Sequence, residues 1–313
     1  ALAPALAETA DTIRVRAADG RTLVNHANGC VEDPRLGWID GELHLTVACR
    51  MFPPGPYWEH DEPGQCAPEW ASTGNHTLGR AARENLTVTV LYRVDLSQLA
   101  ARNYDRAFTY LTHLTDPERA DNRDVFLFPS RLPMGGRLRY VALHRPFAPQ
   151  RYGAPAGTPP CIYLAAADRI EDLPTDAAEH RLFAQSLFPW EANRTGASWV
   201  PLPLENGQWL ISYHGKQDAT VGYTQGFIIT RNDSDGWPVV AHRCPDRLLY
   251  ASEPWHLEGR FRTPCVFTCG GIVRGADLLM TYGAADTTAG LVRVNFSDLI
   301  DYVRGFDADG RRR

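Results

Sequence analysis

The residues best suited to acid–base chemistry stand in one short string near the start of the chain, Gly29-Cys-Val-Glu-Asp-Pro-Arg35. Pro34 fixes its own φ angle and biases Asp33 toward an extended backbone, so the Asp33 carboxyl group is expected to point in a defined direction. A carboxylic acid held in this way can donate a proton to a leaving group. The structural alternative is a solvated turn in which Asp33 pairs with an arginine.

Four further strings stand downstream and place basic and acidic residues beside aromatic ones. They are Asp121-Asn-Arg-Asp-Val-Phe-Leu-Phe-Pro129 with Tyr140-Val-Ala-Leu-His-Arg-Pro146, Trp209-Leu-Ile-Ser-Tyr-His-Gly215, and Met280-Thr-Tyr-Gly-Ala-Ala-Asp-Thr287. Together with the acidic string, they resemble glycoside hydrolase family 130, the mannoside phosphorylases, in content and in order. They also resemble the related glycosyltransferase family 108, the trypanosomatid β-1,2-mannosyltransferase/phosphorylases. The resemblance covers roughly residues 13 to 303.

The resemblance implies an all-β fold, a five-bladed β-propeller with short flanking helices, and an active site in its central depression. It assigns the role of general acid in an inverting reaction on β-mannosides to Asp33. In the family's phosphorylases, the proton is thought to pass through a sugar hydroxyl. Asp286 is the counterpart of the aspartate that contacts mannose, and Arg35 and Tyr223 are further candidates for substrate binding.

Phosphate binding separates a phosphorylase from a hydrolase. An inverting hydrolase needs a second carboxylate about 6.5–9.5 Å from the acid to activate water, whereas phosphate is already an anionic nucleophile and needs cations to hold it. The family's phosphate-binding positions correspond here to Arg123, Arg145, Arg194 and His214. If these side chains meet around one oxyanion, they favour phosphorolysis. A carboxylate at their meeting point would count against it.

Each of these residues has a structural alternative. Arg123 and Arg145 could pair with Asp121 and Asp124 at the surface, and His214 could be a core histidine. The match of Arg194 to the family's phosphate-binding position depends on a one-residue shift in the alignment.

The favoured function is an inverting β-mannoside phosphorylase that acts on β-1,2-linked manno-oligosaccharides. It would release mannose 1-phosphate, or extend an acceptor in the reverse direction. The expected partners are therefore β-mannan oligosaccharides, mannose 1-phosphate and inorganic phosphate as co-substrate, with no metal and no other cofactor. Three alternatives remain open: a β-1,2-mannosidase that uses Glu205 or Glu258 as base, a GDP-mannose-dependent β-1,2-mannosyltransferase, and a carbohydrate-binding propeller without activity.

Composition limits the class of protein. The chain has 313 residues with 44% hydrophobic and 22% charged residues, which is typical of a globular protein. A net charge of −5 offers no global basic surface for nucleic acid, and no apolar run is long enough to span a membrane. Lys216 is the only lysine. The seven cysteines lack the spacing of a zinc ribbon, and the first residues make a poor secretory signal, so we expect an intracellular protein with free thiols.

Strand patterns dominate the remainder of the chain. Short apolar or alternating runs bounded by turn residues predict strands, and helical periodicity is credible only over 96–111 and 296–303, the second with Asn295 as N-cap. The expected strands are 41–49, 86–94, 125–128, 138–144, 161–165, 209–213, 226–230, 239–242, 278–282 and 290–294. Residues 52–80 and 146–160 are expected to be long loops. We expect a single catalytic domain over residues 1–313, with a first blade that is incomplete or built differently, because only 32 residues precede Asp33.

Overall fold

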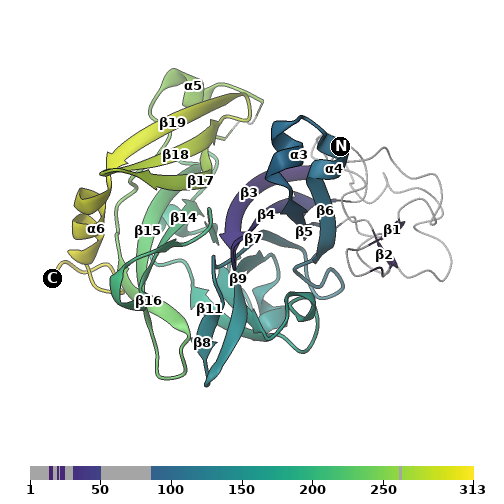
Figure 1. The fold of residues 1–313 in the computed structure, drawn as a ribbon. Coiled ribbons are helices and arrows are strands. Elements are labelled where there is room, and N and C mark those ends of the chain that lie inside the picture. Colours follow the sequence, from purple (N-terminus) through teal and green to yellow (C-terminus); the bar gives the residue numbers. More distant parts are fainter. Residues whose placement is uncertain (1–13, 17–19, 21, 25–30, 51–85, 261–262) are drawn as a thin grey trace.

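The computed structural model describes residues 14–16, 20, 22–24, 31–50, 86–260 and 263–313. Its regular structure is almost entirely β: four antiparallel sheets of three or more strands follow one another along the chain (Figure 1). A separate pair, β1 (Arg14–Arg16) and β2 (Thr22–Val24), forms a two-stranded ribbon. The fold is therefore all-β and propeller-like, as the sequence predicts.

The first two sheets lie in the amino-terminal half of the described chain. The first consists of β3 (Val31–Ile39), β4 (Glu42–Cys49), β5 (Val88–Val94) and β6 (Phe108–His113), in that spatial order. The second consists of β7 (Asn122–Leu127), β9 (Arg137–Pro146), β10 (Ile162–Ala167) and β11 (Glu179–Ala184), with β8 (Leu132–Met134) paired to β9.

The third and fourth sheets complete the series. The third consists of β12 (Arg194–Ala197), β14 (Trp209–Lys216), β15 (Tyr223–Asn232) and β16 (Pro238–Arg243), with β13 (Leu202–Pro203) paired to β14. The fourth consists of β17 (Val266–Arg274), β18 (Asp277–Ala284) and β19 (Thr288–Asn295).

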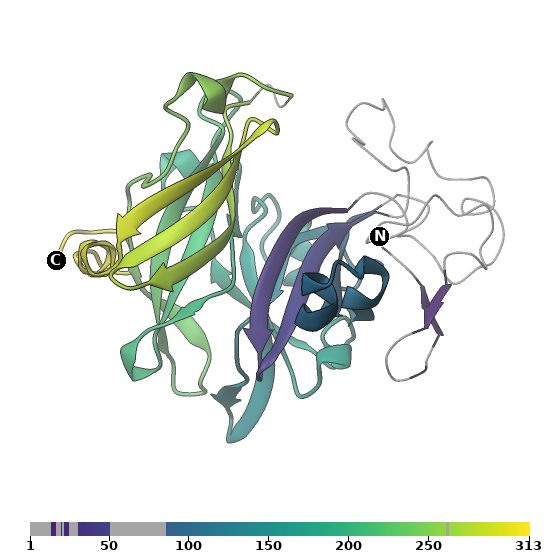
Figure 2. The ribbon, with the colours of Figure 1, turned by 45° about the horizontal axis from the view of Figure 1, so that its top comes forward.

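Helices are few and short. They are α3 (Leu96–Ala100), α4 (Tyr104–Ala107), α5 (Pro254–Leu257) and α6 (Phe296–Arg304), with single 3₁₀ turns at η5 (Pro149–Tyr152), η6 (Ile170–Asp172), η7 (Pro189–Glu191) and η8 (Glu205–Gly207). Helices α3 and α4 lie beside the first sheet, and α6 lies at the opposite side of the molecule (Figure 2). The Asn295 side chain accepts a hydrogen bond from the backbone N–H of Asp298, so the predicted N-cap of α6 is confirmed.

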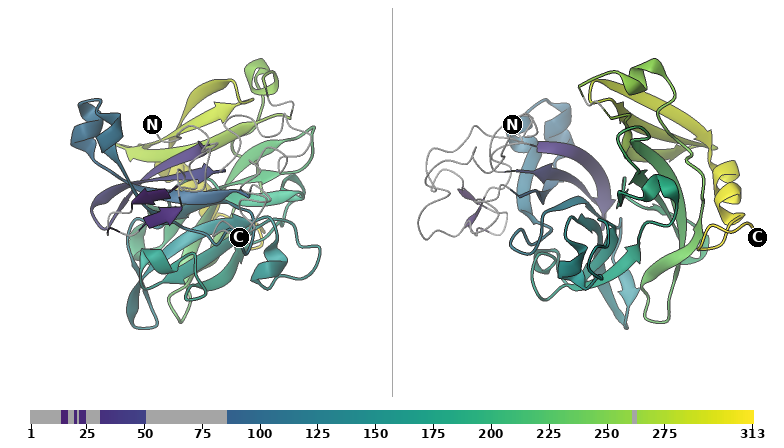
Figure 3. Two further views of the ribbon diagram at one scale, coloured as in Figure 1. Left: turned by 90° about the vertical axis from the view of Figure 1, so that its right-hand side faces the viewer. Right: turned by 180° about the vertical axis from the view of Figure 1, so that it is seen from behind.

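The sheets are arranged around a common centre, as Figure 3 shows from behind. The first strand of each sheet is an edge strand that lies at this centre: β3 is adjacent to β7 and β17, and β12 is adjacent to β7. Side chains near the centre-facing ends of these strands can therefore meet, although they are far apart in the sequence.

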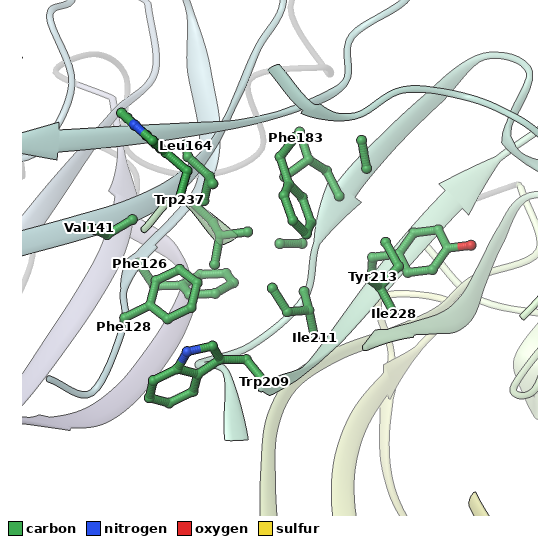
Figure 4. Close-up of a cluster of buried hydrophobic side chains, with 14 of the residues drawn as sticks. Phe126, Phe128, Val141, Leu164, Phe183, Trp209, Ile211, Tyr213, Ile228 and Trp237 are labelled. Carbon is green, nitrogen blue, oxygen red and sulfur yellow. The ribbon is translucent and has the colours of Figure 1, made fainter. Parts of the chain in front are cut away.

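Apolar side chains fill the spaces between successive sheets. The largest cluster joins the second and third sheets and contains Phe126, Phe128, Trp209 and Tyr213 (Figure 4). A second cluster joins the first sheet to the second, and a third joins the third sheet to the fourth and to α6. Burial of alternate residues against the neighbouring sheet is what stabilises this arrangement.

The number of sheets differs from the expected five blades. In the described chain four sheets have the size of a blade, and the strands of the β1–β2 ribbon, with three residues each, pair only with one another. No cluster of buried apolar residues joins the fourth sheet to the first within those same residues. Leu36 and Trp38 of β3 remain 56% and 54% exposed. The five-bladed expectation is therefore wrong for the part of the chain that the structure describes, because three-residue strands do not build a blade.

All ten predicted strands are present, with boundaries shifted by a few residues. The predicted helix over 96–111 is wrong in its second half. Arg102 has a left-handed backbone (φ 60°) that ends α3, and Phe108 begins β6. The loop over 146–160 contains η5, and the loop over 52–80 lies outside the described residues.

Gly215 is required by the packing of the third sheet. A Cβ at this position would lie 2.5 Å from the Trp190 ring and 2.9 Å from the Trp190 carbonyl oxygen. We expect Gly215→Ala to lower the free energy of unfolding by about 1–3 kcal/mol, because the indole cannot move without displacing backbone. Urea denaturation measures this. Gly283→Ala is the matched control, since its Cβ would meet only the Phe267 carbonyl oxygen at 4.0 Å; equal losses in both variants would contradict the packing argument.

Candidate active site

A pocket of about 520 Å³ opens at the centre of the molecule, and all four sheets contribute to it. Its walls combine carboxylates, guanidinium groups and aromatic rings. The lining residues are Glu32, Asp33, Pro34, Arg123, Asp124, Arg145, Phe147, Arg194, Lys216, Tyr223, Cys265, Phe267, Cys269, Gly283 and Asp286. Six of the eight residues proposed from the sequence therefore line this one pocket, and the other two, Arg35 and His214, lie beneath it.

Asp33 reaches the pocket from a bulge in β3. The pairing of β3 with β4 shifts between Glu32 and Arg35, and Asp33 has a left-handed backbone (φ 53°). The extended backbone expected from Pro34 is therefore wrong at this residue, because the bulge imposes its own conformation. The bulge also lets Glu32 and Asp33 both face the pocket, although successive residues of a regular strand face opposite ways. Such local strain is common at functional sites.

Arg35 supports Asp33 from below. Its guanidinium is 2% exposed; Nη1 donates to the Asp33 carbonyl oxygen at 3.1 Å, and Nη2 lies 3.8 Å from the Asp33 carboxylate. Its Nε donates to the Ser198 carbonyl oxygen at 2.6 Å. Arg35 therefore fixes the position of Asp33 but does not itself line the pocket.

Three guanidinium groups gather around one aromatic ring in the same pocket. The Cζ atoms of Arg123, Arg145 and Arg194 lie 5.7, 4.7 and 5.4 Å from the centre of the Phe147 ring. These arginines come from β7, β9 and β12, and β7 and β9 are neighbours in register at Arg123 and Arg145. Arg123 also pairs with Glu32, with Nη1 and Oε1 3.2 Å apart. Burial raises the pKa of Glu32, and the Arg123 charge opposes that rise.

Asp124 occupies the point between Arg145 and His214. Its carboxylate is 1% exposed, with Arg145 Nε at 2.5 Å, Arg35 Nη2 at 3.4 Å and His214 Nε2 at 3.4 Å. Burial alone would raise the pKa of Asp124, but Arg145, His214 and Arg35 hold it well below its usual value. The pairing of Arg145 with Asp124 that was considered from the sequence is therefore present, but the pair is buried rather than at the surface.

His214 is fully buried on β14 and faces Asp124 rather than the pocket. Its Nδ1 lies 3.4 Å from Ser198 Oγ, which in turn donates to Gln225 at 2.7 Å. Burial lowers the pKa of His214, and the Asp124 charge opposes that effect. In this arrangement His214 reaches an anion in the pocket only through Asp124.

Asp286 faces Asp33 from the turn after β18. Ala285 and Asp286 both have left-handed backbones (φ 49° and 52°), and Gly283 and Asp286 line the pocket. Partial burial and the neighbouring Asp33 raise the pKa of Asp286. Two carboxyl groups that interact in this way can exchange hydrogen bonds with the hydroxyl groups of a sugar.

The remaining wall joins the third and fourth sheets. Lys216 lies with Nζ 5.1 Å from the centre of the Tyr223 ring, and it is paired across strands with Arg194. Burial and Arg194 lower the pKa of Lys216. Burial raises the pKa of the Cys265 thiol to about 12, so this pocket cysteine is not an activated nucleophile.

The two glutamates considered as hydrolase bases lie elsewhere. Glu205 is exposed in η8 near α6, and Glu258 is exposed at the end of α5. Neither residue lines the central pocket. A water-activating role for either one has no support in the geometry.

Sequence reasoning missed several lining residues with defined contacts, among them Glu32, Asp124 and Phe147. Glu32 and Asp124 stand beside assigned residues in their strings, and each belongs to a charged pair that a bulge turns toward one side of the strand. Two charged residues in succession within a strand were the signal by which Glu32 and Asp124 could have been found. Phe147 follows Arg145 by two residues and carries no polar group, so its role as the shared contact of three arginines appears only in three dimensions.

A buried histidine pair adjoins the arginine-bearing strands. His144 lies 3.1 Å from the Asn122 amide and 3.2 Å from the ring of His180, and Asn122 and His144 directly precede Arg123 and Arg145. Burial lowers the pKa of His144 well below its usual value, and burial lowers the pKa of His180 to about 4. Both rings are therefore neutral at neutral pH.

Acid should destabilise the protein through this pair. A histidine with a folded pKa of about 4 and an unfolded value of 6.5 takes up its proton on unfolding, so its stabilising contribution is lost as pH falls between these values. We expect the free energy of unfolding of His180→Gln to fall less steeply than that of the wild type between pH 6.5 and 4.5. The difference in slope should correspond to at most about one proton taken up on unfolding, and urea denaturation at each pH measures it. The comparison at pH 7.5 is the control. An unchanged acid limb in the variant would remove His180 from the explanation.

The fold and the pocket define a β-propeller-like protein whose centre brings carboxyl groups together with a cluster of arginines. The sequence model of glycoside hydrolase family 130, described as beta-1,4-mannooligosaccharide phosphorylase, matches residues 139–305, which is more than half of the chain. The chain belongs to this family.

Similar proteins include several phosphorylases. The chain is 27% identical over 179 residues to a 1,2-beta-oligomannan phosphorylase of Thermoanaerobacter sp. (57% of this chain, 52% of the relative). It is 30% identical over 129 residues to a beta-1,4-mannooligosaccharide phosphorylase of Ruminococcus albus (40% of this chain, 38% of the relative). The chain thus spans about half the length, or less, of these curated relatives.

Solved structures support the fold. The beta-1,2-mannobiose phosphorylase from Listeria innocua, in complex with beta-1,2-mannobiose, superposes with a TM-score of 0.59 at 22% identity, covering 87% of this chain and 60% of that one. A second structure, described as a putative glycoside hydrolase from Bacteroides ovatus, gives a TM-score of 0.54 at 13% identity, covering 94% and 74% of the two chains.

The described residues contain no group of three or more His, Cys, Asp or Glu side chains placed to hold a metal ion. Among the helices of that same part of the chain, none is long and apolar enough to cross a membrane.

Proposed function

We propose that this protein is an inverting β-mannoside phosphorylase that cleaves β-1,2-linked manno-oligosaccharides with inorganic phosphate. The products would be mannose 1-phosphate and a shortened oligosaccharide, and the reverse reaction would transfer mannose to an acceptor. Membership of the phosphorylase family supports the reaction class. The β-1,2 linkage rests on the oligomannan and mannobiose phosphorylases among the relatives.

The observation that carries the proposal is the gathering of Arg123, Arg145 and Arg194 around Phe147 inside the pocket. Three positive charges held this close repel one another, and a bound oxyanion would offset that repulsion. Forked guanidinium donors match the oxygen geometry of phosphate. The same pocket also holds Asp33 and Asp286, so it offers groups both for an anion and for a sugar.

In the proposed reaction, a phosphate oxygen attacks the anomeric carbon as the bond to the leaving oxygen breaks, with inversion. Asp33 supplies the proton that neutralises the leaving oxygen, through a sugar hydroxyl or directly, and accepts one in the reverse direction. Asp286 and Tyr223 bind the mannose, while Arg35 and His214 support the site from beneath. No cofactor is required, because phosphate arrives as an anion.

A mannosidase is the second candidate, and the observation in its favour is Asp124. This carboxylate lies where a phosphorylase needs cations, and an inverting hydrolase needs a second carboxylate. However, Arg145, His214 and Arg35 surround Asp124 and hold its pKa well below the usual value, which makes it a poor acceptor of a proton from water. Its burial to 1% also leaves little room for that water.

Incubation with β-1,2-mannobiose, with and without inorganic phosphate, tests the proposal. We expect mannose 1-phosphate to form only when phosphate is present. Release of free mannose at equal rates in both samples would identify a hydrolase instead. A third sample with GDP-mannose and an acceptor, in which GDP release is measured, identifies a nucleotide-sugar transferase.

We also propose that the protein acts as a single catalytic unit inside the cell. The pocket draws residues from all four sheets, which supports one unit. The described cysteines Cys161, Cys244, Cys265 and Cys269 are free, which fits a reducing compartment. Sensitivity of the activity to oxidation would not discriminate between locations. Detection of the enzyme in a cell fraction tests the location directly.

A further inference from the structure

Asp124 joins three sheets at the base of the pocket. Its carboxylate on β7 meets Arg145 of β9, Arg35 of β3 and His214 of β14. All four side chains are at most 4% exposed, so water contributes little to their solvation. A carboxylate enclosed in this way has its position fixed by its partners and fixes theirs in turn.

The backbone at Asp124 is specialised for this placement. β7 is bulged between Arg123 and Phe126, and Asp124 has a left-handed backbone (φ 56°). As in β3, the bulge brings two successive charged residues to the lining of the pocket. Arg123 is thereby presented to the pocket, and Asp124 is turned toward the groups below it.

Gly196 on β12 leaves the room that the carboxylate needs. A Cβ at this position would lie 2.1 Å from Asp124 Oδ2 and 2.7 Å from the His214 ring. No side chain can occupy that place unless the carboxylate or the imidazole moves. The glycine next to Arg194 and Thr195 is therefore part of the same arrangement.

Arg145 shows what the arrangement achieves. Its Nε donates to Asp124 at 2.5 Å, while its Nη1 is buried without a hydrogen-bond partner among the described residues. A buried donor without a partner costs free energy unless a ligand supplies the acceptor. With Nε held by Asp124, the guanidinium of Arg145 stays beside Phe147, where Arg123 and Arg194 also lie.

We propose that Asp124 is a positioning residue of the phosphate site: it holds Arg145 through Nε so that the opposite edge of the guanidinium binds the anion, and Gly196 keeps the space that this requires. The proposal rests on the function proposed above. It reverses the simple electrostatic expectation, in which a carboxylate this close to a phosphate would only weaken binding.

Two variants separate position from charge. Asp124→Asn removes the charge that orders Arg145, and Gly196→Ala keeps the charge but displaces the carboxylate. We expect each to weaken the binding of inorganic phosphate about 10- to 100-fold, the size expected for a lost charge-assisted hydrogen bond, and to raise the phosphate KM by a similar factor. The KM for mannobiose should change by no more than about 2-fold.

Glu191→Gln is the matched control. Glu191 is also a buried carboxylate, paired with Arg243 at 2.8 Å and with the Tyr213 hydroxyl at 2.6 Å, and it does not line the pocket. Its substitution should lower the melting temperature without changing phosphate affinity. This control shows that loss of a buried ion pair alone does not produce the phosphate effect.

Calorimetry with inorganic phosphate and no sugar gives the decisive readout. A folded Asp124→Asn protein that binds phosphate as tightly as the wild type, or more tightly, overturns the proposal, and so does wild-type affinity in Gly196→Ala. Because binding is measured without turnover, the two proposals fail separately. A wild-type protein that binds phosphate but does not use it as nucleophile ends the proposed function and leaves this comparison valid.

Discussion

The Asp33→Asn protein should lose turnover by a factor of about 10²–10⁴ while it still binds phosphate, because an amide occupies nearly the same volume but has no acidic proton to donate. Asp33 lies in the pocket with Asp286 nearby, and Arg35 below holds its backbone and faces its carboxylate. The substitution leaves the arginines around Phe147 untouched, so phosphate calorimetry should give the wild-type affinity. Initial rates of phosphate-dependent cleavage of β-1,2-mannobiose measure the loss.

Asp40→Asn is the matched control for this experiment. Asp40 follows β3 in the turn to β4, also with a left-handed backbone (φ 49°), and it pairs with Arg131 away from the pocket. Asparagine tolerates this conformation well, so the control should keep full activity. If Asp33→Asn retained near wild-type phosphorolysis, Asp33 would have no place in the mechanism.

Arg145→Ala should raise the phosphate KM by about 100-fold or more, with a smaller change in the KM for mannobiose. The estimate follows from the loss of a charge-assisted contact of about 3 kcal/mol, at 1.4 kcal/mol for each factor of ten. Arg145 is 4% exposed and lines the pocket beside Phe147, so its truncation removes one guanidinium from the cluster of three arginines. Initial rates at varied phosphate and fixed mannobiose give the constant.

Arg139→Ala provides the comparison on the same strand. Arg139 is 7% exposed on β9 and pairs with Asp168 and Glu179, outside the pocket. It should lose stability through its broken ion pairs but keep the phosphate KM. An Arg145→Ala enzyme with unchanged phosphate dependence would remove the anion site from the cluster around Phe147.

The bulges in β3 and β7 bring adjacent charged residues to the pocket. Glu32 and Asp33 on β3, and Arg123 and Asp124 on β7, are adjacent charged pairs that reach the same pocket because each strand carries an extra residue at this point. A regular strand would send one member of each pair to the opposite face. Deleting the bulge in either strand would therefore separate the proton donor from its neighbours, or Arg123 from Asp124.

Much of the secondary structure could be predicted from the sequence. Apolar alternation and turn residues are local signals, and the ten strands they predicted are all present. The same local reasoning failed over 96–111, where a left-handed Arg102 ends the helix and residues from Phe108 onward pair with β5. Periodicity alone does not predict a strand that depends on a partner nearby in space.

The sequence by itself determined the class of fold, the family and the identity of the charged side chains, because these depend on local patterning and on short strings of residues. Only the tertiary structure decided how those side chains divide the work: Arg123, Arg145 and Arg194 share the ring of Phe147, while His214 lies beneath them behind Asp124. The physical reason is that burial and charge pairing are set by groups brought together from different sheets. The bulges and the space beside Gly196 that bring them together are properties of backbone packing, which no single stretch of sequence contains.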